Sequence, residues 1–160
     1  VSNTVRRQPV GDMDGVPDPE VSRRFVMRLD AYVRNLAAPA RGPIDDTARR
    51  GQQLFDGIGC TGCHKPTLGQ VKGAFTDLLL HNMGPKLDSH IKDGLATGAQ
   101  WRTAPLWGLR HRKRYLHDER AGTIDEVMMV HLGEAKGASD RYRKLPASAR
   151  DAIVAFLGSL

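Results

Sequence analysis

Cys60-Thr61-Gly62-Cys63-His64 contains both cysteines of the sequence, separated by two residues and followed directly by a histidine. The spacing Cys-x-x-Cys-His is the attachment signature of c-type haem. Two thiols at this spacing reach the two vinyl groups on one edge of the porphyrin, and the adjacent imidazole then lies beneath the ring to bind iron. The stretch therefore predicts one covalently attached haem c, with Cys60 and Cys63 as the attachment points and His64 as an iron ligand.

Two other kinds of site use a Cys-x-x-Cys pair: a thioredoxin-like redox site and half of a zinc site. A zinc site needs two more ligands at comparable spacing, and the sequence has no further cysteine. A thioredoxin-like pair lies in a βαβ unit, and the flanking residues show no such pattern. Haem attachment is the interpretation that remains, and because it takes place outside the bacterial cytoplasm, we expect a periplasmic protein.

Helical periodicity lies on both sides of the haem motif. Before the motif, Asp45-Asp46 gives a capping signal, and at the other end of the chain Pro146 suits a first helical position. The two apolar stripes are Ala48, Gly51, Leu54, Phe55 and Ile58 in one helix and Ala149, Ala152, Ile153, Phe156, Leu157 and Leu160 in the other. Because Gly51 has no side chain, we expect the two helices to cross closely there.

The N-terminal part adds a helix and a lead-in. Residues 1–16 are polar and are predicted to be extended; the chain begins without an apolar signal segment, so we expect a processed product or a piece of a longer chain. A helix is predicted to begin with Asp18 as cap and Pro19 in first position, and to end at Ala38-Pro39. No run alternates in polarity over a strand's length. We therefore predict an all-α, class I cytochrome c-like fold with an extra N-terminal helix and long loops, as one domain over residues 17–160.

A further helix is predicted from about Ile124 to Leu132. Thr123 and Glu126 form a capping box at its start. Its apolar face carries both Met128 and His131, each a candidate for the iron position opposite His64. The residues alone leave these two open. The histidines and methionines that we consider less well placed are His81, His90, His111, His117, Met13, Met27 and Met83.

The charge of the chain is positive. Lysine and arginine number 24 against 18 aspartate and glutamate, a net charge of +6. Only residues 110–114 form a dense basic run, and no aromatic residues are interleaved as stacking platforms for bases. We therefore exclude nucleic acid and expect a solvated basic face or an acidic redox partner protein. The most apolar segment, Thr76 to Leu80, is far too short to span a membrane.

Several segments match a known family in order along the chain. They are residues 32–39, 51–55, the haem motif, 77–84, 101–109, 115–118, 123–131 and 133–135. Together they resemble the C-terminal haem domain of the bacterial di-haem cytochrome c peroxidase superfamily, and within it the di-haem (thiol) oxidoreductase branch. The chain departs from the family pattern at Glu119, where a glycine normally follows the His-Asp pair.

The resemblance implies roles for particular residues. In that superfamily the position of His131 holds the distal iron ligand, so the resemblance favours His131 over Met128 and implies a bis-histidine haem. It also implies that Arg102 contacts a haem propionate and that His117 lies in the haem environment without binding iron. The segment beside the haem comprises Trp101, Arg102, Pro105 and Leu106. Calcium between haem domains is a further family feature, bound largely by backbone atoms.

The family carries two haems, whereas this sequence has one Cys-x-x-Cys-His. An iron held by His64 and His131 has no open position, so it passes electrons without binding peroxide, and two imidazoles lower its potential relative to a His/Met pair. We expect an electron-transfer haem domain or subunit of a di-haem, peroxidase-like oxidoreductase, which relays electrons to a second haem in a partner or in a segment outside this sequence. No residue is assigned a catalytic role, and whether the chain alone is an enzyme stays open. The alternative is a stand-alone monohaem cytochrome c that only carries electrons.

Overall fold

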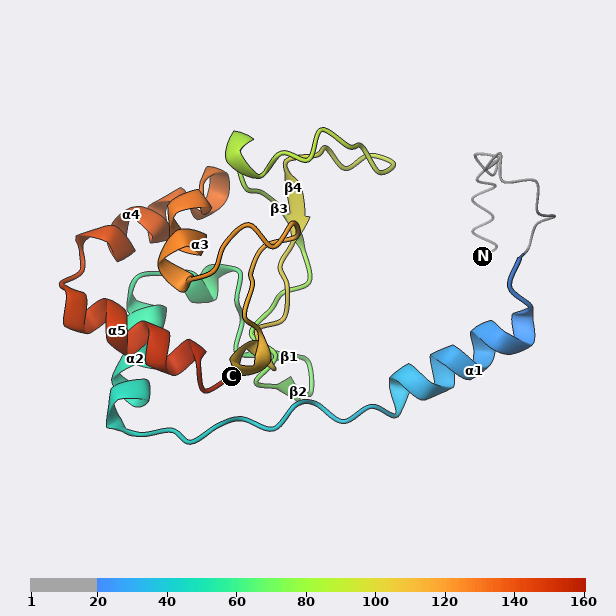
Figure 1. The fold of residues 1–160 in the computed structure, drawn as a ribbon, viewed down its shortest axis with the longest axis horizontal. Helices are drawn as coiled ribbons and strands as arrows, with labels where there is room; N and C mark the ends of the chain where they lie inside the picture. Colours follow the sequence, from blue (N-terminus) through green and yellow to red (C-terminus); the bar gives the residue numbers. More distant parts are fainter. Residues whose placement is uncertain (1–19) are drawn as a thin grey trace. The chain divides into compact units, whose positions relative to one another are not determined.

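The computed structural model describes residues 20–160, so the predicted lead-in over residues 1–16 and the Asp18 cap lie outside the described residues. The chain divides into two compact units at Ala37–Ala38, and the prediction of a single domain over 17–160 stays a prediction. The described part of the N-terminal unit contains helix α1 (Arg23–Arg34; Figure 1). It begins after Ser22, whose hydroxyl accepts a hydrogen bond from the Phe25 amide (3.3 Å), and it ends before the predicted Ala38-Pro39.

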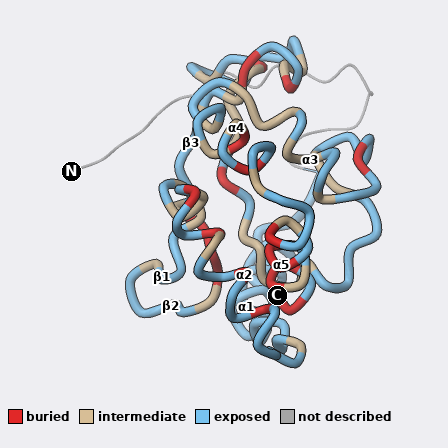
Figure 2. Tube along the Cα trace, turned by 90° about the vertical axis from the view of Figure 1, so that its left-hand side faces the viewer, coloured by how far each residue is buried: buried red, intermediate tan, exposed pale blue. Residues whose placement is uncertain are grey.

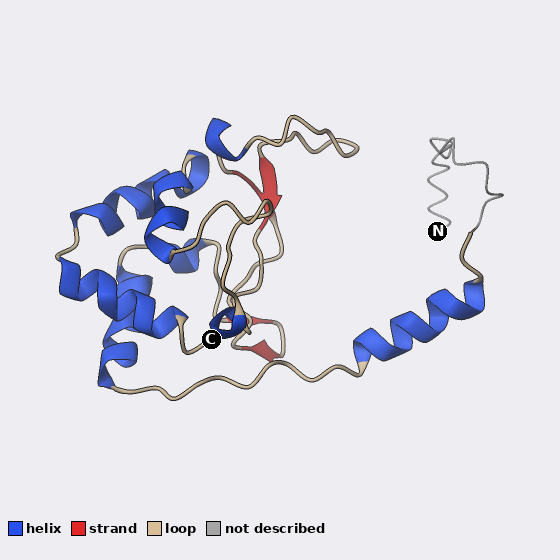
Figure 3. Cartoon of the chain, in the orientation of Figure 1, coloured by secondary structure: helices blue, strands red, loops and turns tan. Residues whose placement is uncertain are grey.

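The second unit carries the remaining elements (Figure 3). Its α-helices are α2 (Asp46–Gly57), α3 (Ile124–Val130), α4 (Lys136–Lys144) and α5 (Ala147–Leu157). Its short 3₁₀ helices are η1 (Cys60–Gly62), η2 (Pro85–Leu87), η3 (Leu109–His111) and η4 (Gly133–Ala135), and its strands are β1 (Thr67–Leu68), β2 (Val71–Lys72), β3 (Leu80–Asn82) and β4 (Gln100–Arg102). No helix of the described residues has the length and apolar character needed to cross a bilayer.

Helices α2 and α5 pack closely, and the core forms around their contact. The close crossing predicted at Gly51 is confirmed: a Cβ there would lie 1.8 Å from the carbonyl oxygen of Ala152. Phe156 lies 5.3 Å from Phe55 and 5.4 Å from Phe75 between ring centroids. Buried residues follow these two helices in Figure 2. The core cluster contains Phe55, Ile58, Phe75, Tyr142, Ile153, Phe156, Leu157 and Leu160.

The all-α prediction is wrong, because the structure contains two small antiparallel sheets. Strand β1 pairs with β2 through a tight turn. Strand β3 pairs with β4, with His81 opposite Trp101. Each strand is only two or three residues long, which is too short to show alternating polarity in a sequence. The β3–β4 pairing also joins segments that are distant in sequence, so no hairpin signal announces it.

Helix α4 was missed by the sequence analysis. Its sequence is mostly charged or small, and it buries only Ser139 and Tyr142. Both residues form hydrogen bonds to helix α3. The Ser139 hydroxyl donates to the carbonyl oxygen of Met128 at 2.5 Å, and the Tyr142 hydroxyl donates to Asp125 at 2.9 Å. Helix α4 therefore fastens both ends of helix α3.

Candidate functional site

The two cysteines lie where α2 leads into η1. Both are free thiols and half-buried, and Cys60 packs against the core cluster. Burial raises the pKa of Cys60 to about 12 and also raises the pKa of Cys63. Both side chains are thus protonated at neutral pH and are not joined to each other, which leaves two sulfurs available for thioether bonds, one at the start of η1 and one at its C-cap.

The ring of His64 is oriented by the backbone of Phe75. Its Nδ1 lies 3.0 Å from the carbonyl oxygen of Phe75, which can only accept, so Nδ1 carries the hydrogen and Nε2 keeps a free lone pair. Phe75 has a φ of +51°, an uncommon conformation for a bulky residue, which turns this carbonyl to the ring. Burial lowers the pKa of His64, and His131 lowers it further. His64 is a neutral imidazole suited to bind a metal through Nε2.

His131 has the same arrangement on another element. It is the C-cap of α3 and not part of the helix, which ends at Val130 and not at the predicted Leu132. Its Nδ1 donates to the carbonyl oxygen of Val127 (2.9 Å), so Nε2 is again free. Burial lowers the pKa of His131, and the charge of a protonated His131 contributes to lowering the pKa of His64. Met128, the other candidate, packs against the core cluster.

The capping box predicted at the start of α3 is confirmed. The Thr123 hydroxyl accepts from the Glu126 amide (3.2 Å), and the Glu126 carboxylate accepts from the Thr123 amide (3.2 Å). This cap satisfies amide groups that a seven-residue helix leaves without intrahelical partners. Because His131 is the C-cap of the same short helix, the N-terminal cap also helps to hold His131 in place.

We expect Thr123→Ala to lower the free energy of unfolding by about 1 kcal/mol, the usual cost of losing a side-chain cap. Urea denaturation of the variant and of the unchanged protein measures this difference. Thr47→Ala is the matched control, because Thr47 is an exposed threonine inside α2 and we expect a change below about 0.5 kcal/mol there. Equal losses in the two variants would contradict the capping role.

The other predicted site residues lie on and after β4. Trp101 stacks on His117 with ring centroids 3.9 Å apart and donates from Nε1 to the carbonyl oxygen of Leu87 (2.6 Å). Arg102 is exposed, Pro105 and Leu106 are half-buried, and Leu106 also packs against the core cluster. The structure brings Trp101 and His117 together, and their roles and those of Arg102, Pro105 and Leu106 beside a haem stay predictions.

Glu119, the departure from the family pattern, has a φ of +58°. This is the left-handed region that glycine adopts without strain, so the turn keeps the conformation that a glycine would favour. The substitution therefore leaves the backbone of the turn in place, at a small conformational cost.

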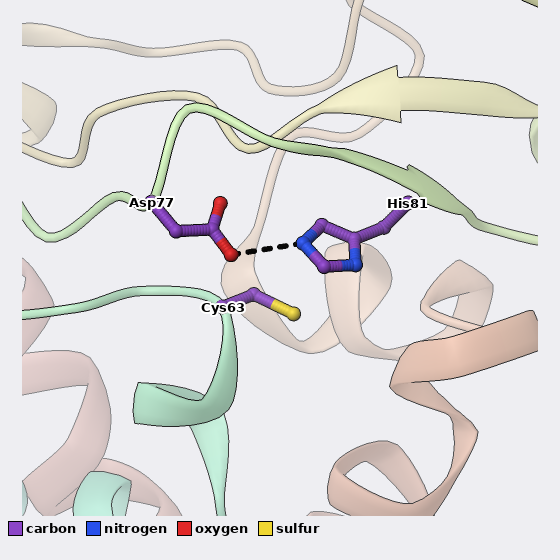
Figure 4. Close-up of side chains that lie close together, drawn as sticks. All are labelled: Cys63, Asp77 and His81. Carbon is purple, nitrogen blue, oxygen red and sulfur yellow. Dashed lines mark hydrogen bonds and ion pairs between the residues drawn. The ribbon is translucent and has the colours of Figure 1, made fainter.

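A cluster that the sequence analysis did not find surrounds His81 (Figure 4). Ligand atoms of Cys63, Asp77 and His81 lie within 4.8 Å of one another. The Nε2 of His81 lies 2.9 Å from Asp77 and its Nδ1 lies 2.7 Å from Glu134. The sequence gives no local signal for this cluster, because Glu134 meets strand β3 only through the tertiary fold. In a haem-bearing chain, Cys63 would form a thioether and would offer no thiolate to a metal ion. The hydrogen-bonded residues Asp77, His81 and Glu134 would then remain of this cluster.

The sequence and the fold are similar to those of known proteins. A sequence profile described as "Di-haem oxidoreductase, putative peroxidase" matches residues 7–160. Among solved structures, hydrazine synthase of Kuenenia stuttgartiensis is similar over 87% of this chain, with a TM-score of 0.64 and 17% sequence identity. At that identity the likeness shows the fold alone, and it spans 56% of the hydrazine synthase chain. No curated protein matches the chain.

Proposed function

The chain belongs to the di-haem oxidoreductase family, and on that premise we propose that it is an electron-transfer haem domain of a two-haem, peroxidase-like oxidoreductase. One observation carries the proposal. His64 and His131 are half-buried, neutral imidazoles, and each has Nδ1 bound to a backbone carbonyl and Nε2 free. Two such rings would supply two nitrogen ligands for one iron.

The residues present fit a covalently bound haem c. Cys60 and Cys63 supply two unpaired thiols at the spacing of the two vinyl groups, and His64 follows them directly. The backbone carbonyls of Phe75 and Val127 hold the two imidazoles in the tautomer that an iron ligand needs. His131 is therefore the distal ligand in this proposal, and Met128 keeps its place against the core.

When bound, the haem supplies an iron that changes between the ferric and ferrous states. His64 and His131 would hold this iron, and with both imidazoles bound no position would be open to peroxide. Two imidazoles would also favour the ferric state more than a His/Met pair does, which would lower the potential. The protein's contribution is to hold these ligands through a one-electron change with little rearrangement.

The second haem of the pair belongs to a partner or to a segment outside this chain, because the sequence holds one attachment motif. The exposed run over residues 110–114 suits an acidic redox partner. Among residues 20–160, no ion pair involves a side chain of residues 110–114. Covalent haem attachment makes the periplasm the proposed location, and calcium between haem domains is proposed with no residue assigned to it.

Carbon monoxide binding to the ferrous haem-loaded protein at pH 6 tests this function. We expect a slow reaction whose rate does not depend on the carbon monoxide concentration, because His131 must leave the iron first, together with fast electron exchange with a small mediator. A rate proportional to carbon monoxide concentration would show an open iron and contradict the relay. Native mass spectrometry of the assembled protein distinguishes this function from the alternative. One haem per particle, with no partner, would show that the chain is a stand-alone electron carrier.

A further inference from the structure

His81 lies between two carboxylates, one on each side of its ring. Nε2 is 2.9 Å from Asp77 and Nδ1 is 2.7 Å from Glu134. An ionised carboxylate only accepts, so both ring nitrogens must donate and the ring must be an imidazolium. The side chains of His81 and Asp77 are only 17% and 12% exposed, so water replaces the bond between them poorly, whereas the Glu134 side chain is 55% exposed. The bonds to Glu134 and then to Asp77 raise the pKa of His81 in agreement with this geometry.

The two ends of this hydrogen-bonded chain reach the segments that hold the proposed axial ligands. Asp77 lies two residues after Phe75, whose carbonyl orients His64. Glu134 lies three residues after His131. The chain Asp77–His81–Glu134 therefore links the segment behind one iron ligand to the segment behind the other.

The segment that follows His131 is attached to strand β3 at three points. The carboxylate of Glu134 accepts from the Asn82 amide at 2.8 Å through one oxygen and binds His81 through the other. Gly133 packs so tightly that a Cβ would lie 2.1 Å from the carbonyl oxygen of Asn82, and its φ of +55° suits glycine. Glu134 thus supplies two of the three attachments, and one of them needs a charged His81.

We propose that protonated His81 is a positioning residue for His131, and that loss of its proton weakens the bond of His131 to iron. A neutral imidazole has a single N–H, so one of the two carboxylates would face a lone pair and that link would break. Because the pKa of His81 is raised above its usual value, the link is intact at pH values below the usual pKa of histidine. It is lost as the pH rises through the raised pKa. The inference rests on the axial pair in the proposed function.

The other charged groups around His81 do not titrate in the same range. Burial raises the pKa of Asp77, but hydrogen bonds from the Leu79 amide and His81 outweigh it, and His81 likewise lowers the pKa of Glu134. Arg102 on the adjacent strand β4, which pairs with Leu80, is the other charged side chain of this sheet. On the side of η1, the Cys63 sulfur is a thioether in the haem-loaded protein and His64 is held by iron. His81 is thus the group of this hydrogen-bonded chain that changes charge as the pH rises through its raised pKa.

The test measures the rate at which carbon monoxide binds to the ferrous, haem-loaded full chain between pH 6 and pH 9. That rate reports how often His131 leaves the iron. We expect it to rise about tenfold across this range, the size expected for one hydrogen bond between charged groups. In His81→Gln the fast rate is expected at every pH. In Glu134→Gln, which keeps an oxygen for the Asn82 amide, the rise is expected to move to lower pH, and this variant serves if His81→Gln does not fold.

His90→Gln is the matched control, because the His90 side chain is 86% exposed and lies 3.7 Å from a single carboxylate, Asp88. It should keep the pH profile of the unchanged protein. A flat profile in the unchanged protein, or the same rise in His81→Gln, would overturn the inference. Nitrogen-15 NMR of the ferrous protein reads the protonation of His81 independently of the axial pair. A neutral ring at pH 6 would overturn the inference even where both iron ligands are as proposed, whereas fast binding at pH 6 would overturn the proposed function itself.

Discussion

Gly51→Ala is expected to destabilise the second unit by about 3 kcal/mol or more, the upper range for overpacking a core. The added Cβ would lie 1.8 Å from the carbonyl oxygen of Ala152 and 2.9 Å from the Cβ of Phe156. Neither atom belongs to the end of a flexible side chain, so α2 and α5 must separate to make room. The loss of contact would extend into the core cluster. Thermal unfolding followed by circular dichroism is the measurement, and we expect a decrease in Tm of roughly 10 °C or more.

Gly57→Ala is the matched control in the same helix. A Cβ at Gly57 would meet nothing within 4 Å, and alanine is the better helix former. The control should therefore be neutral or raise the stability by up to about 1 kcal/mol. If both variants unfolded at the same temperature as the unchanged protein, the close helix crossing would not be the centre of this fold.

His131→Ala is expected to convert a low-spin, six-coordinate iron into a high-spin iron with an open position. Removal of the distal imidazole leaves His64 as the single axial ligand from the protein, and the potential should rise because one strong donor is lost. Optical spectra show the change of spin state, and carbon monoxide binding should become fast and proportional to its concentration. The fold should survive, because the His131 side chain makes a single hydrogen bond to Val127 in the described residues.

Met128→Leu separates the two ligand candidates that the sequence left open. Leucine keeps nearly the same volume against the core cluster, so the stability should change by less than about 1.5 kcal/mol. We expect the optical spectrum to stay that of the unchanged protein. A spectrum altered by Met128→Leu and unaffected by His131→Ala would instead assign the thioether to the iron.

The parts of the fold that the sequence predicted are those with local signals. The capping box at Thr123 and Glu126 needs only four consecutive residues, and the helix crossing at Gly51 follows from an apolar stripe interrupted by one glycine. The Cys-x-x-Cys-His spacing is likewise local. The capping box and the helix crossing are confirmed in the structure. The haem motif is the basis of the proposed function.

The parts that the sequence could not predict depend on tertiary contacts. Strands β3 and β4 are three residues each and meet across a long loop, so no periodicity precedes the pairing. Helix α4 buries only Ser139 and Tyr142, so its sequence shows no apolar stripe, and hydrogen bonds from these two residues join it to α3. The His81 cluster needs both the sheet and η4 in place before Glu134 reaches the ring. The sequence therefore pointed to the proposed ligands but not to the groups that hold their segments together.

The most direct test of the axial pair is low-temperature EPR combined with near-infrared magnetic circular dichroism of the oxidised, haem-loaded protein at pH 6. We predict a low-spin ferric iron with the charge-transfer band of two nitrogen ligands, His64 on one side and His131 on the other. A band of histidine–methionine ligation, or a high-spin ferric signal, would contradict it.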